Sequence, residues 1–308
     1  MDGILNIHKP AGMTSFDVVA KIRRLTATKK VGHAGTLDPD ATGVLPVCTG
    51  RATKVIEYLM EKDKAYRAVM LLGESTDTQD ATGVRLKEMD AEAGDEEILK
   101  VMAGFVGTRL QLPPMHSAVR INGKRLYELA RKGEEVERTP RPVTFYSLIP
   151  EGIHRFETEN GKRAEVTFLV ECSKGTYIRT LCHDMGEALG CGGHMKTLVR
   201  TRSGPFRLEE SVTLQSLEKA KEEGTLESLF LSMDKALAHM PAFHVDALGE
   251  KRLSNGMVII TESPDNPPKT GEPELVRLYS HEGRFLGIGN KWIKDRERAA
   301  VKAAKWIG

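Results

Sequence analysis

The chain has 308 residues, of which 40% are hydrophobic and 29% charged, a composition that excludes an intrinsically disordered protein. Lysine and arginine number 45 against 43 aspartates and glutamates, so the net charge is +2 and local basic clusters must hold any anionic partner. The apolar runs are too short for a membrane span, and the N-terminus lacks the pattern of a signal peptide. We therefore expect a cytoplasmic protein with no membrane contact.

The first part of the chain predicts strands and helices around one long loop. In chain order we expect a strand over residues 3–10, a helix over 16–25 capped by Thr14 or Ser15, a loop over 31–50 and a helix over 52–62 with Val55, Ile56, Leu59 and Met60 inward. The loop is rich in glycine and small residues. Long ordered loops in compact domains are often functional.

Helices and strands continue to alternate irregularly as far as residue 190. The expected elements are a strand over 65–73, a helix over 95–105 capped by Asp95, a short helix over 125–132, strands over 142–149 and 166–170, and a helix containing Leu181, Met185 and Leu189. No regular βαβ rhythm is present. The pattern therefore predicts an α+β fold with a largely antiparallel mixed sheet.

The C-terminal residues form a separate, β-rich unit in this interpretation. A helical stretch ends near 238–243, which divides the chain into residues 1–240 and 241–308. Two strands, 275–279 and 284–288, predict a hairpin, and residues 263–274 predict a loop. Residues 284–308 hold seven basic residues against two acids, together with both tryptophans, and basic residues interleaved with aromatics suit RNA.

Several common chemistries have no motif in this chain. A P-loop and a GxSxG nucleophile elbow are both missing from the sequence. The four cysteines (Cys48, Cys172, Cys182 and Cys191) form no CxxC pair, and together with His183 and His194 they match no common zinc spacing. We therefore expect reduced thiols and no metal site.

One loop stands out chemically. Residues 32–46 bring glycine backbone close to any ligand, and Pro39 holds the preceding Asp38 extended. A carboxylate fixed in this way suits a nucleophile or a base, and it suits equally an aspartate that closes an Asx-turn. Upstream, residues 20–30 contain five basic residues and no acid: Lys21, Arg23, Arg24, Lys29 and Lys30. Such a run indicates either a solvated helix face or a phosphate-binding surface.

The same loop resembles the catalytic-aspartate motif of the TruB family, the bacterial tRNA pseudouridine-55 synthases. It reads GHAGTLDPDATGVLPVCTGRATK. Three further blocks resemble family motifs and stand in the family's order: residues 8–15, 64–78 and 172–180. Residues 113–142 resemble the thumb that lies over the T arm, and residues 241–308 resemble the PUA-like domain. The resemblance spans about residues 3–207, and four blocks in order make it specific.

The resemblance implies a pseudouridine synthase fold that isomerises the T-loop uridine at position 55 of tRNA. The base is flipped out, the glycosidic bond breaks, and C5 re-bonds to the sugar, without metal or cofactor. The resemblance implies that Asp38 is the catalytic aspartate, that Arg179 pairs with it, and that Tyr66 stacks on the target base. Around them it places Tyr177 in the active site, Leu198 in an apolar pocket and His33 where the flipped nucleotides were. Further expected contacts are Lys9 to the substrate and, to the RNA backbone, Arg23, Arg24, Lys29 and Lys30. An arginine beside Asp38 would favour the ionised carboxylate.

Two alternatives remain beside this interpretation. The chain could be the catalytic subunit of a guide-RNA particle, although the first motif stands at the start of this chain, which favours an enzyme that acts alone. It could also be a non-catalytic tRNA-binding or folding factor, which needs the basic clusters but not Asp38. The main interpretation expects a monomer that binds the T arm of tRNA, with the acceptor arm reached by the C-terminal unit.

Overall fold

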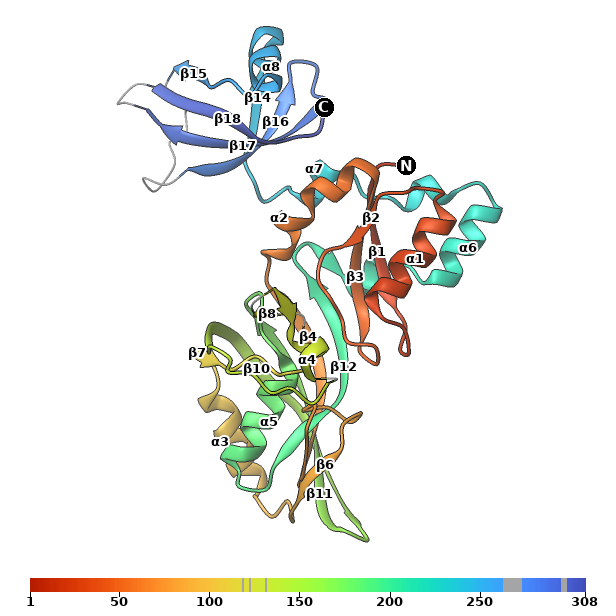
Figure 1. Ribbon diagram of the computed structural model, residues 1–308, viewed down its shortest axis with the longest axis vertical. Helices are drawn as coiled ribbons and strands as arrows, with labels where there is room; N and C mark the ends of the chain where they lie inside the picture. The colour runs from red at the N-terminus through yellow and green to blue at the C-terminus, as the bar shows by residue number, and fades with distance from the viewer. Residues whose placement is uncertain (118, 122, 131, 263–272, 295–297) are drawn as a thin grey trace.

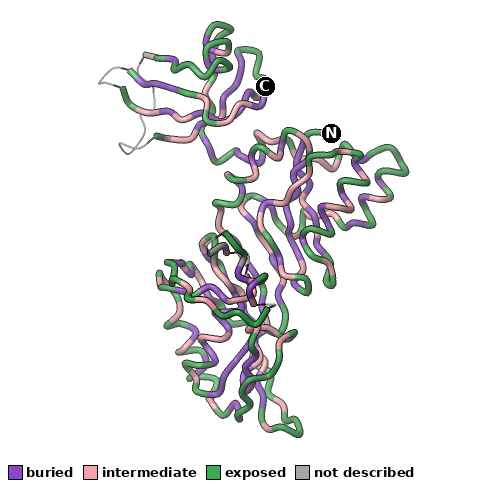
Figure 2. The backbone as a smooth tube through the Cα atoms, viewed as in Figure 1, coloured by how far each residue is buried: buried purple, intermediate pink, exposed green. Residues whose placement is uncertain are grey.

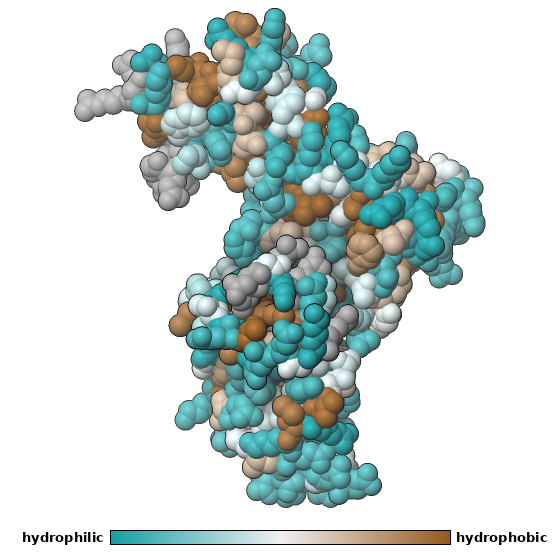
Figure 3. All heavy atoms as spheres, viewed as in Figure 1, coloured by the Kyte–Doolittle hydropathy of each residue, from teal (hydrophilic) through white to brown (hydrophobic). Residues whose placement is uncertain are grey.

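A computed structural model describes the chain apart from residues 118, 122, 131, 263–272 and 295–297. Figure 1 shows an elongated molecule, with a five-stranded sheet at one end and a nine-stranded sheet through the rest. Buried residues run along the strands at the centre of both sheets, as Figure 2 shows. The visible surface is mostly hydrophilic, with apolar residues in small separate patches (Figure 3). Among the described residues, no helix combines the length and the apolar character needed to cross a lipid bilayer.

The first elements confirm the predicted strand and helix. They are β1 (Gly3–Lys9), α1 (Ser15–Leu25), β2 (Val31–His33) and β3 (Thr42–Thr49). Thr14 caps α1: its hydroxyl accepts from the backbone of Asp17, whose carboxylate accepts from the backbone of Thr14. The loop expected over 31–50 is too long. Both of its ends are strands, because β3 pairs with β1 on one side and with β2 on the other.

The next helix also differs from the prediction. A 3-10 helix, η1 (Gly50–Val55), precedes a short α2 (Ile56–Met60), where one continuous helix was expected over 52–62. Val55 and Leu59 are buried as predicted, whereas Met60 is 45% exposed. A 3-10 helix has three residues per turn, so the tighter first turn rotates the following side chains away from the face that an α-helix would bury.

The central strands and helices build the larger sheet. They are β4 (Lys64–Leu72), β5 (Glu74–Thr76), β6 (Arg85–Glu88), α3 (Asp95–Gly104), β7 (Gly107–Gln111), β10 (Arg141–Thr158), β11 (Gly161–Cys172), α5 (Ile178–Ala188), β12 (Gly193–Ser203) and β13 (Phe206–Arg207). The sheet runs in the order β1-β3-β12-β4-β11-β10-β7. Gly94 rather than Asp95 is the N-cap of α3. The largely antiparallel α+β arrangement confirms the predicted fold class.

An insertion projects between β7 and β10. It contains β8 (Arg120–Ile121), β9 (Lys124–Arg125) and α4 (Leu126–Ala130), close to the expected helix. Gln111 and Arg141, which border it, are partners across the antiparallel β7–β10 ladder. The insertion therefore leaves the sheet and returns to it at a single pair of neighbouring residues.

The main core lies between the sheet and the helices α3 and α5. Alternate residues of β4 point into it (Tyr66, Ala68, Met70 and Leu72), and so do Val166, Phe168 and Val170 of β11, as their predicted alternation required. Figure 1 shows α3 and α5 side by side against the lower part of this sheet. The core therefore fixes β4, β12 and α5 relative to one another.

A short parallel seam joins the two halves of the sheet. At this seam β12 meets β3 through the pairs Val199–Thr42 and Arg200–Gly43. Gly43 has a φ of +102°, and a Cβ there would lie 2.3 Å from the carbonyl oxygen of Arg200. Only glycine allows this approach. The seam therefore brings the chain that precedes β3 directly against β12.

The chain then returns to β1 before entering the smaller sheet. This return contains η2 (Leu208–Glu210), α6 (Leu214–Glu222), η3 (Leu226–Leu229) and α7 (Met233–Ala236). Helix α6 packs beside α1, and Leu217 joins the core cluster of Val18 and Ile22. The backbone of Leu231 exchanges hydrogen bonds with that of Ile4.

The smaller sheet confirms the predicted hairpin. The elements of this C-terminal part are β14 (Ala242–Val245), α8 (Ala247–Ser254), β15 (Ile259–Glu262), β16 (Glu274–Ser280), β17 (Phe285–Ile293) and β18 (Arg298–Trp306). Strands β16 and β17 pair antiparallel. The loop predicted over 263–274 lies almost wholly outside the described residues. The end of β18 docks on η1 and α2: Lys54 Nζ donates to the Trp306 carbonyl at 2.9 Å, and Lys305 pairs with Glu57 at 2.6 Å.

Candidate active site

Residues 34–41 form a tight loop between β2 and β3, and we call this segment the Asp38 loop. The Ser15 hydroxyl, at the start of α1, accepts from the Leu37 backbone N–H at 2.9 Å and lies 3.2 Å from the Leu37 carbonyl oxygen. The Ala41 N–H donates to the Asp38 carbonyl, and the Gly12 N–H donates to the Pro39 carbonyl. The loop backbone is therefore fixed from both sides, and Asp38 is presented at its tip.

Asp38 and Arg179 form a two-point ion pair. Arg179 Nε lies 3.0 Å from Asp38 Oδ2, and Arg179 Nη2 donates to Asp38 Oδ1 at 3.3 Å. The Arg179 side chain is 5% exposed and that of Asp38 is 36% exposed. Paired contacts of this kind fix the plane of the carboxylate as well as its position.

Arg179 is held in turn by two other segments. It lies in α5, and its guanidinium donates to the Thr78 carbonyl at 3.2 Å and to the His116 carbonyl at 2.7 Å. Asp80 Oδ2 lies 3.7 Å away. Arg179 thus connects the Asp38 loop to the turn after β5 and to the insertion between β7 and β10.

The pKa of the Asp38 carboxyl is raised above its ordinary value of 3.8. Burial is the main cause, and the neighbouring Asp80 carboxylate acts in the same direction, whereas Arg179 lowers the pKa. Arg179 therefore favours the ionised carboxylate as expected, but the larger effect of burial gives the pKa a net rise. Arg179 offsets only part of the effect of burial on the ionised carboxylate. The carboxylate of Asp38 is therefore more basic than that of an ordinary aspartate.

Tyr66 and Leu198 lie beside the Asp38 loop, as their expected roles require. Tyr66 of β4 is 8% exposed and Leu198 of β12 is 7% exposed, and both belong to the core cluster that includes Leu37 and Ala41. Burial raises the pKa of the Tyr66 hydroxyl to about 12, so it stays protonated at neutral pH. Because Leu37 and Ala41 flank Asp38 in the chain, this apolar cluster borders the Asp38 loop.

Tyr177 is the N-cap residue of α5 and stands two positions before Arg179. Its backbone N–H donates to Gln111 Oε1 at 2.8 Å, and its carbonyl accepts from Gln111 Nε2 at 3.0 Å. Burial raises the pKa of its hydroxyl. Gln111, which sequence reasoning missed, thereby fixes the start of the helix that carries Arg179.

Lys9 has a different place from the one expected. It is completely buried, and Nζ donates to the carbonyls of Pro10 at 2.8 Å, Met13 at 2.6 Å and Pro39 at 2.7 Å. An ammonium group has three donors, and these three carbonyls use them all. Burial lowers its pKa to about 8. The structure therefore assigns Lys9 to shaping the Asp38 loop from below rather than to contact with a substrate.

His33 lies in β2 at the edge of the same loop and is half-buried. Its Nδ1 atom is buried and has no hydrogen-bond partner among the described residues. Burial, followed by the charge of Arg200, lowers the pKa of the imidazole. A neutral ring with an unused nitrogen is compatible with the expected contact to nucleotides.

The basic run divides into two groups. Lys21 pairs with Glu218 of α6 at 2.9 Å, so an acid that is distant in sequence neutralises part of the run. Arg23 and Arg24, at the end of α1, and Lys29 and Lys30, after it, are exposed. These four side chains form a positive surface on the same segment that leads into β2 and the Asp38 loop.

Arg200 is the most important residue that sequence reasoning missed. It lies in β12 and is 1% exposed. Its Nε donates to the Val44 carbonyl at 2.7 Å, Nη1 to the Thr36 carbonyl at 3.2 Å and Nη2 to the Gly35 carbonyl at 3.0 Å. The signal was present in the strand alternation, because Arg200 shares a face with the buried Leu198 two residues earlier.

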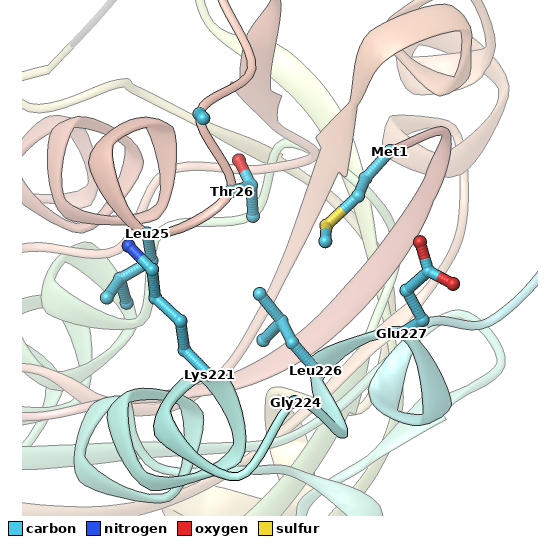
Figure 4. A pocket seen from close by; sticks show the side chains of 8 residues that line it. Met1, Leu25, Thr26, Lys221, Gly224, Leu226 and Glu227 are labelled. Carbon is cyan, nitrogen blue, oxygen red and sulfur yellow. The ribbon is translucent and has the colours of Figure 1, made fainter.

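The described residues contain no group of three or more histidine, cysteine or acidic side chains that could hold a metal ion. Cys48, Cys172, Cys182 and Cys191 are all free and buried, and burial raises the pKa of each thiol. Figure 4 shows a pocket lined by residues that include Met1, Leu25, Lys221 and Glu227. None of the residues around Asp38 lines it.

Two family models match consecutive parts of this chain. The model described as TruB family pseudouridylate synthase (N terminal domain) matches residues 23–178. The model described as tRNA pseudouridylate synthase B C-terminal domain matches residues 179–238. The first match alone covers more than half of the chain and contains Asp38 and Tyr66.

Curated relatives and solved structures agree with these matches. A Bacillus subtilis (strain 168) protein named tRNA pseudouridine synthase B is 44% identical over 292 residues, which is 94% of this chain and 92% of the relative. A Clostridium perfringens (strain SM101 / Type A) protein of the same name is 46% identical over 295 residues, 94% of this chain and 95% of the relative. A chain from "Crystal Structure of a Cbf5-Nop10-Gar1 Complex" is similar with a TM-score of 0.74 and 29% identity, covering 99% of this chain and 85% of that chain.

Proposed function

This chain belongs to the TruB family of pseudouridylate synthases, and from that premise we propose that it isomerises the T-loop uridine at position 55 of tRNA to pseudouridine. The observation that carries the proposal is the Asp38–Arg179 pair, held in a rigid glycine-containing loop beside Tyr66. Relatives at 44–46% identity named tRNA pseudouridine synthase B support tRNA as the substrate.

The proposed roles follow from where each side chain lies. Asp38 acts on the flipped nucleoside, and its raised pKa makes the ionised form a stronger base or nucleophile. Arg179 orients that carboxylate through two contacts. Tyr66 offers its ring to the target base, with Leu198 and Tyr177 closing the pocket. Base–aromatic stacking contributes about 1–3 kcal/mol, which offsets part of the cost of flipping.

RNA contact beyond the pocket is assigned to three regions. His33 occupies the place of the flipped nucleotide, and the exposed Arg23, Arg24, Lys29 and Lys30 contact phosphates without reading bases. The insertion about residues 113–142 lies over the T arm. The C-terminal unit, residues 241–308, is a PUA-like module that contacts the acceptor arm. Residues 1–240 form the catalytic domain, which acts as a cytoplasmic monomer without metal or cofactor.

The alternative of a subunit in an RNA–protein particle draws on the likeness, at 27–29% identity, to chains from a Cbf5-Nop10-Gar1 complex and from an H/ACA RNP bound to a substrate RNA. The more similar sequence relatives carry the name of a tRNA enzyme, which favours action without a protein partner. The non-catalytic alternative has no use for the Asp38–Arg179 pair. A partly exposed carboxylate with a raised pKa, held by a buried arginine, favours catalysis over binding alone.

The decisive experiment uses purified protein alone with an unmodified T-arm hairpin. Pseudouridine content is measured by mass spectrometry after nuclease digestion, next to a hairpin in which cytidine replaces the target uridine. We expect conversion of the target uridine without any added protein or guide RNA, and none in the cytidine control. Binding without conversion would support the non-catalytic alternative. Conversion only in a parallel reaction with added guide RNA would support the alternative of a guide-RNA particle.

A further inference from the structure

Arg200 is a fully buried cation at the seam between β3 and β12. Its guanidinium donates to the carbonyls of Gly35 and Thr36, both in the Asp38 loop, and to the carbonyl of Val44 in β3. No acidic side chain is among the partners found within hydrogen-bond distance in the described residues. The positive charge is stabilised by backbone dipoles that all belong to the segment around Asp38.

Arg200 also lies next to Tyr66. Arg200 of β12 and Tyr66 of β4 are direct partners in the antiparallel ladder, so their side chains lie on the same face of the sheet. Burial lowers the pKa of Arg200, and electrostatic attraction to the Tyr66 hydroxyl offsets part of that effect. One side chain therefore bonds to the Asp38 loop and lies beside Tyr66.

Burying an ion costs several kcal/mol, a cost that the hydrogen bonds to the three carbonyls have to offset. Only arginine carries donors in a planar fork wide enough to reach carbonyls on two segments at once. The ammonium of lysine is a single point and cannot span these partners.

We propose that Arg200 is a positioning residue that fixes the Asp38 loop against Tyr66, so that the carboxylate and the ring keep one relative placement when the target base lies between them. The inference rests on the proposed function, because the placement of the Asp38 carboxylate relative to the Tyr66 ring affects the rate only if the target base binds between them. It adds a second arginine to the site, which acts on backbone and ring, whereas Arg179 acts on the carboxylate itself.

The test replaces Arg200→Lys, which keeps the charge and loses the fork. We expect the single-turnover rate on the T-arm hairpin to fall roughly 10- to 100-fold, since a misplacement of about 1 Å can cost about 100-fold. The dissociation constant for the RNA should stay within about threefold. Arg202→Lys is the matched control: it lies on the same strand, is half-exposed and pairs with Glu171 at 3.3 Å. That variant should keep both values.

A double-mutant cycle separates positioning from general loss of structure. Tyr66→Phe removes the hydroxyl that attracts Arg200 and keeps the ring. If Arg200 acts by joining loop and ring, Arg200→Lys with Tyr66→Phe should be no slower than Arg200→Lys alone. Rate losses that multiply would overturn the proposal, as would a rate loss that merely follows the unfolded fraction in thermal melts.

Should the lysine variant prove unfolded at the assay temperature, Arg200→Met supplies the same test. Its apolar side chain avoids the desolvation cost of a charge but leaves the carbonyls of Gly35, Thr36 and Val44 without this donor. The rates are compared at a temperature at which thermal melts show the methionine variant folded, and there we expect it to be as slow as the lysine variant. A methionine variant with the wild-type rate refutes the positioning role. These outcomes are distinct from failure of the proposed function, in which the wild type binds the hairpin and converts none of it.

Discussion

Asp38→Asn removes one negative charge from the Asp38 loop and changes almost nothing in shape. We expect the single-turnover rate on the T-arm hairpin to fall about 10⁴-fold or more, which corresponds to about 5.4 kcal/mol of lost transition-state stabilisation. The reason is chemical: an amide is neither a nucleophile nor a base at neutral pH. Pseudouridine formed per enzyme in a single turnover measures this directly.

The structure also says what the substitution leaves in place. Asparagine Oδ1 can still accept one of the two hydrogen bonds from Arg179. The guanidinium keeps the His116 carbonyl at 2.7 Å, the Thr78 carbonyl at 3.2 Å and the Asp80 carboxylate at 3.7 Å. The pocket should therefore stay formed, and RNA affinity should stay within about threefold because the phosphate contacts lie elsewhere.

The effect on stability runs against intuition. The folded-state pKa of Asp38 lies above its ordinary 3.8, so its contribution to stability is fully present below that value and is lost as pH rises through the folded-state pKa. At neutral pH the ionised carboxylate thus destabilises the fold, and a neutral asparagine does not. We expect the melting temperature of Asp38→Asn at pH 7 to equal or exceed that of the wild type, with the difference narrowing toward acid pH.

The matched control is Asp40→Asn, the same chemical change two residues further along the same loop, at an exposed position. It should leave the single-turnover rate and RNA affinity near wild-type values. The wild-type rate should itself decline toward acid pH, with a midpoint above 3.8, as Asp38 protonates. An Asp38→Asn enzyme within tenfold of the wild-type rate, or one that melts clearly below the wild type at pH 7, would refute the reasoning.

Three further outcomes are expected. Arg23→Ala with Arg24→Ala should weaken binding to any tRNA similarly and flatten the slope of log affinity against log salt by roughly 0.7–0.9 per lost phosphate contact; an unchanged slope would place the RNA elsewhere. Tyr66→Ala should slow single turnover far more than it weakens binding and leave the salt slope unchanged, because the flipped base is the only part of the RNA proposed to meet this ring; a flattened slope with a normal rate would contradict that placement. Prolonged dialysis against EDTA should leave the rate unchanged, and a loss restored by zinc would overturn the metal-free proposal.

Elements whose pattern is local were predictable from the sequence. The helix cap, predicted at Thr14 or Ser15 and found at Thr14, and the alternation of Val166, Phe168 and Val170 depend on neighbours in the chain. The strand at 42–49 escaped prediction because its glycine and proline argue against a strand, and only pairing with β1 and β2 makes it one.

The site divides in the same way. Asp38 stands in a conspicuous loop, so its sequence draws attention to it. Nothing in the sequence around Arg200 draws attention to it, because its partners are carbonyls some 160 positions earlier in the chain. Only the seam between β3 and β12 brings Arg200 and these carbonyls together. Lys9 shows the converse: a motif marks it as important, yet only its burial shows that its partners are backbone carbonyls rather than RNA.

The insertion between β7 and β10 begins and ends at neighbouring residues, Gln111 and Arg141. A segment attached in this way can be lengthened, shortened or exchanged without moving any strand, because closing a longer loop costs little. New RNA preferences could therefore evolve, or be engineered, by replacing this one cassette. The replacement has to return a backbone carbonyl to Arg179 where His116 now supplies it. A graft that bound a new RNA but lacked that carbonyl would leave the arginine beside Asp38 one hydrogen bond short.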